Sequence, residues 1–339
     1  MIATEAKVTP PVRARRPSAW ERRRLAIAHS TPLLLAFVIL FGLTGLYVVL
    51  FYRQLHSFPG VFEWTSVVNT AVPTVLVAIG QSIVVVTRGI DLSVGGVIDV
   101  SNSLAATQMH PGLGSMLAWS LLILLLGACC GAVNGALVAY ARLQPILVTL
   151  ATLAILQGVA IRILPEPGGA IPTSYSSALA SSSGPWSILF VLGVALLWLA
   201  LRRTSIGVRI FAIGNDEYAA RAHGIPVRQV KVITYSLAGL LAAGSGLFLA
   251  ASTTAGDAAA GDVYILTSIA AVVLGGVSFF GGRGSALGSI AGAFILTVLT
   301  NVLFFAGIDP LYQSFFQGLF LFIAVLLGSL LGRLVRVRS

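Results

Sequence analysis

The chain has 339 residues, of which 57% are hydrophobic and only 9% are charged. Soluble domains carry about 25% charged residues, so this depletion and a mean hydropathy of +0.95 exclude an ordinary soluble protein. The remaining class is an all-α polytopic membrane protein, because no alternating strand pattern of the kind found in membrane β-barrels occurs.

The net charge of +10 is concentrated at the N-terminus. A basic segment ahead of an apolar run is typical of a cytoplasmic tail at an anionic membrane surface and does not indicate a nucleic-acid partner. The run that follows is too long for a secretory signal core, and no convincing cleavage site follows it. We therefore expect residues 1–30 to form a basic cytoplasmic tail, with seven basic residues: Lys7, Arg13, Arg15, Arg16, Arg22, Arg23 and Arg24.

The rest of the chain, residues 31–332, is expected to form one transmembrane domain. Apolar runs near the length of about 20 residues that a span requires predict ten helices. The third is the shortest and most polar. The predicted spans are 31–52, 66–87, 92–108, 115–140, 144–163, 185–202, 229–252, 262–280, 285–305 and 311–332.

Basic residues in the connections predict the orientation. If the N-terminus is cytoplasmic and each span reverses the chain, 19 of the 21 basic residues fall in or next to cytoplasmic segments. Only Arg53 and Arg162 fall outside, which agrees with the positive-inside rule. Both termini, including the basic tail 333–339, are therefore predicted to be cytoplasmic.

The stretch VVTRGIDLSVGGVIDV, residues 85–100, lies between two spans. As a single helix, residues 66–108 would be about 64 Å long, against a hydrocarbon core of about 30 Å. We expect a tight cytoplasmic hairpin in which Gly89 permits the turn, Asp91 caps the next helix, and Arg88 interacts with the dipole of the preceding one.

Two connections are long. Residues 164–184 are rich in Pro, Gly and Ser and are expected to be irregular. Residues 203–228 contain NDEYAARAHG, which predicts a short helix capped by Asn215 or Asp216 and ended by Gly224 at its C′ position. Such a helix is either a docking element for another protein or an ordinary amphipathic surface segment.

Glycines four residues apart indicate close helix packing in two spans. These are Gly127, Gly131 and Gly135 in the fourth span, and Gly284, Gly288 and Gly292 at the start of the ninth. The adjacent cysteines, Cys129 and Cys130, have neither disulfide nor metal-ligand spacing and are interpreted as packing residues.

Polar residues within the spans are few. Asp99 is the only acid near the middle of a span, and it should face protein or water because charge in lipid is costly. Asn102 and Ser103 share its helix face. For each amide, a satisfied interhelical hydrogen bond is the alternative to a role in the substrate pathway. The candidates are Asp99, Ser101, Asn102, Ser103, Thr107, Gln108, Asn134, Gln157, Asn301, Gln313 and Gln317.

Several chemistries find no support. The sequence lacks a P-loop and an HExxH motif, so this chain is expected neither to hydrolyse nucleotide nor to bind a metal. An ion-coupled carrier usually has several buried ionisable groups, and an aspartyl enzyme needs two facing acids. This sequence has only Asp99 near the middle of a span, so it supports neither class. A transport function would then draw its energy from another subunit.

Four strings occur in order: TRGIDLSVGG, LQPILVTLATLAILQGVA, GVRIFAIGNDEYAARAHGI and IAAVVLGGVSFFGGRGSALGSIAGA. Together they resemble the permease subunits of ribose-type ATP-binding-cassette sugar importers, over about residues 66–330. The string GIDLSVG, and Gly281, Gly282 and Arg283 followed by Gly-Ser, are specific in combination.

The resemblance implies a multi-pass protein of the bacterial inner membrane that pairs with a second permease copy or a sister permease. A periplasmic or lipid-anchored sugar-binding protein would deliver the solute, and a cytoplasmic ATPase with ATP and Mg would supply energy. Segment 203–228 would be the coupling loop. The residues expected to couple to the ATPase are Asn215, Asp216, Glu217, Ala219, Ala220, Arg221 and Gly224.

Three residues depart from the family pattern: Asp99, Arg162 and Tyr218, the last in place of one of two paired acids. The resemblance therefore leaves the solute open. Branched-chain amino acids, nucleosides or a signalling sugar are alternatives within the superfamily. An ion-coupled secondary carrier and a membrane enzyme are alternatives from other classes.

Overall fold

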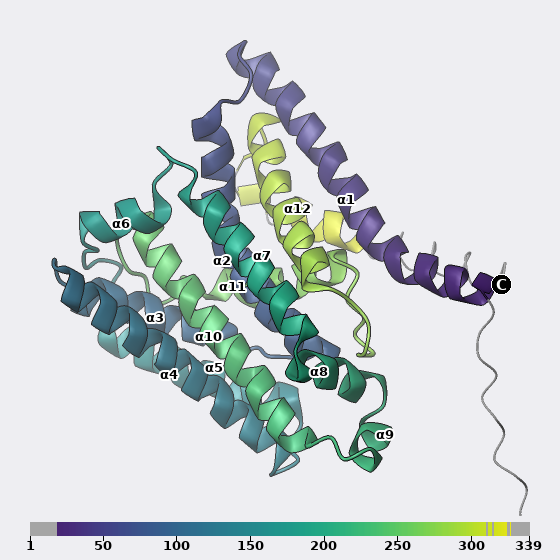
Figure 1. Cartoon of the computed structure of the whole chain (residues 1–339). Helices are drawn as coiled ribbons and strands as arrows, with labels where there is room; N and C mark the ends of the chain where they lie inside the picture. Colours follow the sequence, from purple (N-terminus) through teal and green to yellow (C-terminus); the bar gives the residue numbers. More distant parts are fainter. Residues whose placement is uncertain (1–18, 310, 314, 324–325, 327–339) are drawn as a thin grey trace, which may run out of the picture.

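The computed structural model describes residues 19–309, 311–313, 315–323 and 326. The predicted basic tails lie wholly or largely outside this part of the chain. Within it, the fold is a bundle of helices, as predicted, and the only bridge of β type is an isolated pair between Gly168 and Gly256 (Figure 1). The helices are α1 (Ala19–Leu55), α2 (Val61–Val86), α3 (Val94–Gln108), α4 (Leu113–Ala139), α5 (Pro145–Ile163), α6 (Thr173–Ala180), α7 (Trp186–Arg203), α8 (Ser205–Asn215), α9 (Glu217–Ala222), α10 (Val227–Thr253), α11 (Asp262–Leu274) and α12 (Ala286–Phe305).

Seven helices in the described residues are long and apolar enough to cross a membrane: the stretch Pro32–Leu55 of α1, and α2, α4, α5, α7, α10 and α12. The prediction of ten spans is not confirmed. At 1.5 Å per residue, α3 and α11 are only about 22 Å and 20 Å long, which is less than the hydrocarbon thickness. The tenth predicted span, 311–332, is only partly described, and its described residues are helical.

Two predicted boundaries are wrong. The predicted span 262–280 ends as a helix at Leu274, because Gly275 and Gly276 follow and Gly276 has a left-handed φ of 76°. The connection 164–184, expected to be irregular, contains α6, whose first turn follows Pro172. Helix α1 also begins at Ala19, well before the predicted span.

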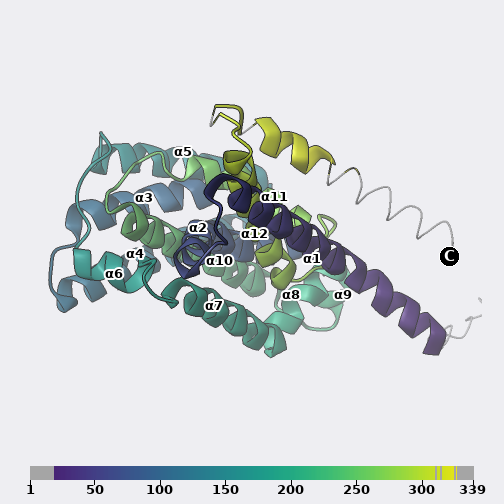
Figure 2. The ribbon, with the colours of Figure 1, turned by 90° about the horizontal axis from the view of Figure 1, so that it is seen from above.

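Helices α2 and α10 form the centre of the bundle. In the apolar stretch of α2, 83% of the residues are buried, against 11% in that of α1. Helix α10 packs on α4, α2 and α3, whereas α12 packs on α1, α2 and α11. An apolar helix buried all round belongs to the core of a bundle, whereas α1 follows its edge (Figure 2).

The bundle has two distinct ends. Helix α6 lies at one end, and α8 and α9 lie at the other (Figures 1 and 2). At the α6 end, the connections 164–172 and 254–261 are joined by backbone hydrogen bonds between Gly168 and Gly256 of 2.8 and 2.9 Å. At the α9 end, Arg88 donates hydrogen bonds to α8, and the guanidinium of Arg228 lies 5.5 Å from the ring centre of Tyr140. Four segments predicted to be on the cytoplasmic side, 88–91, 141–143, 203–228 and 281–284, thus gather at the α9 end.

The predicted glycine contacts join backbones directly. A Cβ atom at Gly131 would overlap the carbonyl oxygen of Tyr235, and one at Gly135 would lie 2.7 Å from the Cα of Val232, so α4 and α10 touch along their glycine faces. In the second set, Gly288 and Gly292 bring α12 onto α11 in the same way. Gly284 precedes the helix, at a φ of 137°, and is not part of that face.

Candidate functional site

Helix α3 carries the polar residues predicted to line a pathway. Asp99, Ser101, Asn102 and Ser103 are all at most 1% exposed. The expectation that Asp99 faces protein and not lipid is therefore confirmed. The helix begins after Ser93 and ends before His110 and Pro111, and it packs between α10, α5 and α4.

The segment after α10 runs back along α3. Asp257 donates its backbone N–H to the Oδ1 of Asn102 at 2.7 Å, and Gly261 donates its N–H to the Oδ1 of Asp99 at 2.6 Å. Because these contacts progress from the middle of α3 toward its N-terminal part, α11 begins inside the bundle and not at the α6 end. Helix α11 is thus a half-helix with an internal N-terminus.

This arrangement gives the side chain of Asp99 a structural role. Its Oδ1 accepts from the backbone N–H of Gly261, the N-cap residue of α11, whereas its Oδ2 is buried without a partner among the described residues. Sequence reasoning found no structural role for Asp99, since the helix that it caps lies 162 residues further on.

Replacing Asp99 should test this role. Asp99→Ala leaves the buried N–H of Gly261 without an acceptor, which costs about 1–3 kcal/mol and should lower the Tm of the purified protein by several degrees. Asp99→Asn retains an oxygen in the same place and serves as the control, with a Tm close to that of the wild type. Equal Tm values for the two variants would contradict the capping role.

The remaining predicted amides have different hydrogen-bond partners in the structure. Asn134 donates to the Oγ of Ser93 at 2.9 Å and accepts from Thr152 at 2.6 Å, so it is a satisfied interhelical link. Asn301 donates to a carbonyl of its own helix. Gln157 reaches the carboxylate of Asp262 at 2.5 Å, close to the internal N-terminus of α11.

Other predicted polar residues are peripheral. Thr107 donates to the carbonyl of Ser103, and Gln317 donates to Thr300 on α12. Arg162 is exposed at the end of α5. None of these three lies in the group formed by Asp99, Asn102 and the segment 254–261.

A pocket of about 360 Å³ opens beside this group at the α6 end. Sequence reasoning identified only Asn102 among its residues. The missed signal was the acidic string GDAAAGD at residues 256–262, which supplies a second group of carboxylates close to α3. The lining residues are Asn102, Pro167, Leu249, Thr253, Ala255, Gly256, Asp257, Ala260, Val263 and Tyr264.

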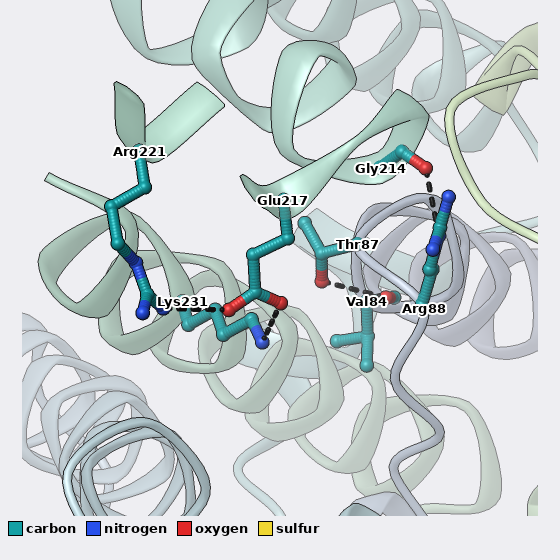
Figure 3. A network of polar contacts seen from close by, with 7 residues as sticks. All are labelled: Val84, Thr87, Arg88, Gly214, Glu217, Arg221 and Lys231. Atoms are coloured by element: carbon teal, nitrogen blue, oxygen red, sulfur yellow. Dashed lines mark hydrogen bonds and ion pairs between the residues drawn. The ribbon is translucent and has the colours of Figure 1, made fainter. Parts of the chain in front are cut away.

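At the α9 end, three of the recognised strings converge. Gly282 donates its N–H to the carbonyl of Val86 at 3.0 Å, and a Cβ atom at Gly214 would overlap both partners of that bond. The side chain of Arg88 donates to the carbonyl of Gly214 at 2.9 Å (Figure 3). It also donates to the carbonyl of Asn215 at 2.8 Å. Glycine is required here because three backbone segments meet without room for side chains.

The hairpin differs from the prediction in detail. Arg88, and not Gly89, has the left-handed φ, at 64°. Gly89 is needed for a different reason, because a Cβ atom there would overlap the hydroxyl of Tyr235. The guanidinium of Arg88 binds the C-terminal end of α8, and only its backbone N–H binds its own helix, at the carbonyl of Val85.

Asp91 also differs from its predicted role as a helix cap. Its Oδ1 accepts from the backbone N–H and the hydroxyl of Ser93, the residue before α3, while its Oδ2 is buried without a partner. Burial raises the pKa of Asp91 to about 6, against the opposing effect of the Ser93 hydrogen bonds. Arg283, the other charge of the hairpin motifs, is exposed.

The short helix predicted in 215–224 is confirmed as α9. Asp216 is its N-cap and accepts from the N–H of Ala219 at 2.9 Å, while Gly224 follows it at a φ of 80°. Glu217 in the first turn pairs with Arg221 at 3.0 Å and with Lys231 of α10 at 2.7 Å (Figure 3). The second pair fastens α9 to α10, and Ala220 is buried beneath it.

Helix α8 was missed. Thr204 caps it by accepting from the N–H of Gly207 at 3.2 Å, and Ile210 and Ile213 are buried against the core. Together, α8 and α9 form a platform on the end of the bundle. Tyr218 projects from it with 85% of its surface exposed, which suits a contact with another protein.

Comparison with known proteins identifies this architecture. Residues 64–325 match the family described as the permease component of the branched-chain amino acid transport system. The chain belongs to this family of transporter permeases. It is 38% identical to the ribose import permease protein RbsC of Bacillus subtilis, over 74% of this chain and 80% of that protein.

Other relatives have similar names. RbsC of Escherichia coli is 34% identical over 75% of this chain and 81% of its own length. The galactose/methyl galactoside import permease protein MglC of Escherichia coli is 29% identical over 84% of this chain and 94% of its own length. No solved structure matches the chain.

Proposed function

We propose that this chain is the transmembrane permease subunit of an ATP-binding-cassette sugar importer in the bacterial inner membrane. The similarity to ribose and galactose import permeases over about three quarters of the chain carries the proposal. The alternative of branched-chain amino acids has only the family description in its favour. A multi-pass bundle with few intramembrane charges fits the passage of a neutral, polar solute.

The platform of α8 and α9 is the proposed docking site for a cytoplasmic ATPase, which would bind ATP and Mg. Its exposed Tyr218 and its attachment to α10 through Lys231 support this assignment. The α9 end is then cytoplasmic, as are both termini. A second permease copy or a sister permease completes the channel, and a periplasmic or lipid-anchored binding protein delivers the sugar at the α6 end.

Reconstitution tests the proposal. Proteoliposomes that contain the permease, its ATPase and its binding protein should take up labelled ribose or galactose only when ATP is present on the ATPase side. Leucine, a nucleoside and the permease without its ATPase serve as controls. Uptake by the permease alone under an ion gradient, or uptake of leucine in preference to sugars, would overturn the assignment.

Gly224 should be required for docking. A β-branched residue at its φ of 80° is strained by about 1–2 kcal/mol, although the space around it is open, so Gly224→Val should disturb the end of α9. We expect about tenfold weaker co-purification with the ATPase and lower transport. Gly224→Asn, which tolerates this conformation, is the matched control. Unchanged co-purification of the valine variant would contradict the docking role.

A further inference from the structure

The pocket at the α6 end combines polar groups with apolar walls. Asn102 comes from α3, Thr253 from the end of α10 and Tyr264 from α11, while Pro167 belongs to the connection before α6. Asp257 is exposed at its edge. Four separate parts of the chain thus enclose a space of about 360 Å³, which is large enough for a small solute.

The side chain of Asn102 contributes a hydrogen-bond donor to the pocket. It is 1% exposed, and its Oδ1 is occupied by the backbone N–H of Asp257. Its Nδ2 forms no hydrogen bond with any residue that the structure describes, although Asn102 lines the pocket. Because Asn102 lines the pocket, its amide donor is available to a molecule there that accepts a hydrogen bond.

The acids next to it supply acceptors. Asp257, which lines the pocket, uses its Oδ1 to bind the N–H of Ala259 and retains a second carboxylate oxygen. Asp262 does not line the pocket, but it lies next to Val263, which does, and its Oδ1 accepts from Gln157. Paired donors and acceptors beside Leu249, Val263 and the ring of Tyr264 match a molecule whose hydroxyl groups both donate and accept, and whose C–H faces are apolar.

We propose that this pocket is a sugar-binding subsite of the permease itself, which holds a monosaccharide through its hydroxyl groups before passage along α3. Asn102 donates to one hydroxyl oxygen, and the Asp257 carboxylate accepts from a neighbouring hydroxyl. The subsite lies beside the internal N-terminus of α11 and opposite the α9 end. This inference rests on the proposed function and deepens it by assigning the residues that contact the sugar.

Cysteine protection tests the subsite without requiring transport. Ala260 lines the pocket, whereas its exposed neighbour Ala259 does not. Ala260→Cys and Ala259→Cys are made in the full chain with Cys129 and Cys130 replaced by alanine. The rate of modification by a small, polar thiol reagent is then measured in membranes with increasing ribose, galactose or leucine.

We expect ribose or galactose to slow modification of the Ala260→Cys variant severalfold and to leave that of the Ala259→Cys variant unchanged. Leucine should protect neither. Equal rates at every sugar concentration would overturn the subsite, as would protection by leucine alone.

A second measurement replaces a residue that is proposed to contact the sugar. Asp257→Asn keeps the acceptor for Ala259 and removes the charge, so the sugar concentration that gives half protection should rise about tenfold. Asp309→Asn removes an exposed acid outside the pocket and is the control, which should behave as the parent chain does. An unchanged half-protection concentration for Asp257→Asn would contradict the assignment.

The experiments distinguish a failure of the sugar subsite from a failure of the importer assignment. If the complete transporter takes up ribose or galactose and the pocket shows no protection, the subsite is wrong and the importer assignment stands. If no sugar is taken up or protects while another solute does both, the importer assignment itself fails.

Discussion

Gly131→Ala is expected to destabilise the protein more than any other replacement of a glycine by alanine on the face of α4. The added Cβ would overlap the carbonyl oxygen of Tyr235, so α4 and α10 must separate. Overpacking of this kind costs about 1–3 kcal/mol, and more where backbone is the obstacle. The Tm of the detergent-solubilised protein should fall by several degrees, and the yield of folded protein should fall with it.

Gly158→Ala is the control for this experiment. Gly158 is also inside a long helix, α5, but a Cβ atom there would meet nothing within 4 Å. Alanine is favoured over glycine in a helix by up to about 1 kcal/mol, so the Tm should be unchanged or slightly higher. The two variants make the same chemical change with opposite expected signs. A fall of equal size in both would contradict the close contact of α4 and α10.

Arg88→Ala is expected to uncouple the platform from the hairpin. Arg88 donates to the carbonyls of Gly214 and Asn215 at the end of α8, and a charged donor to such groups contributes about 1–3 kcal/mol. Its guanidinium is partly in water, so we expect the lower part of this range. Transport in the reconstituted system should fall about tenfold, with a smaller effect on Tm.

Two variants define the cause of that loss. Arg88→Lys keeps the charge but cannot reproduce the two-pronged geometry, so its transport should be intermediate. Arg142→Ala removes another basic residue at the same end of the bundle, which also has a left-handed φ, 56°. Its transport should remain that of the wild type. A loss in Arg142→Ala equal to that in Arg88→Ala would indicate a general effect of charge.

Local signals were sufficient for several elements. Helix α9 was predictable because Asp216 and Gly224 have the residue types of helix ends and Glu217 is an acid in the first turn, and these effects depend on neighbours within a few positions. The packing of α4 was predictable because glycines at a spacing of four must share a helix face. That their partner is α10 required the structure.

Elements that depend on distant contacts could not be predicted. The half-helix α11 looked like the start of a full span, since its apolar run continues beyond Gly275. Asp99 had no explanation, because Gly261, the group that its carboxylate binds, is remote in sequence. Arg88 was assigned to its own helix for the same reason, although its partners belong to α8.

The pocket could be predicted only in part. Asn102 was identified from its position on the polar face of α3, but Asp257 was not considered, because segment 254–261 carries no helical periodicity. Its course along α3 is set by hydrogen bonds to Asp99 and Asn102. A polar residue in a span therefore pointed to the site, and only the fold identified its neighbours.

The continuity of α10 has a mechanical consequence. This one helix begins beside α9, where Lys231 binds Glu217, and ends at Thr253 in the pocket, without a break over 27 residues. Its glycine contacts with α4 hold the two backbones close together. A rotation of the pair by about 5° about its α9 end would displace the pocket end, about 40 Å away, by about 3.5 Å. Such a lever converts a small tilt at the platform into a shift large enough to open or close a passage for a sugar.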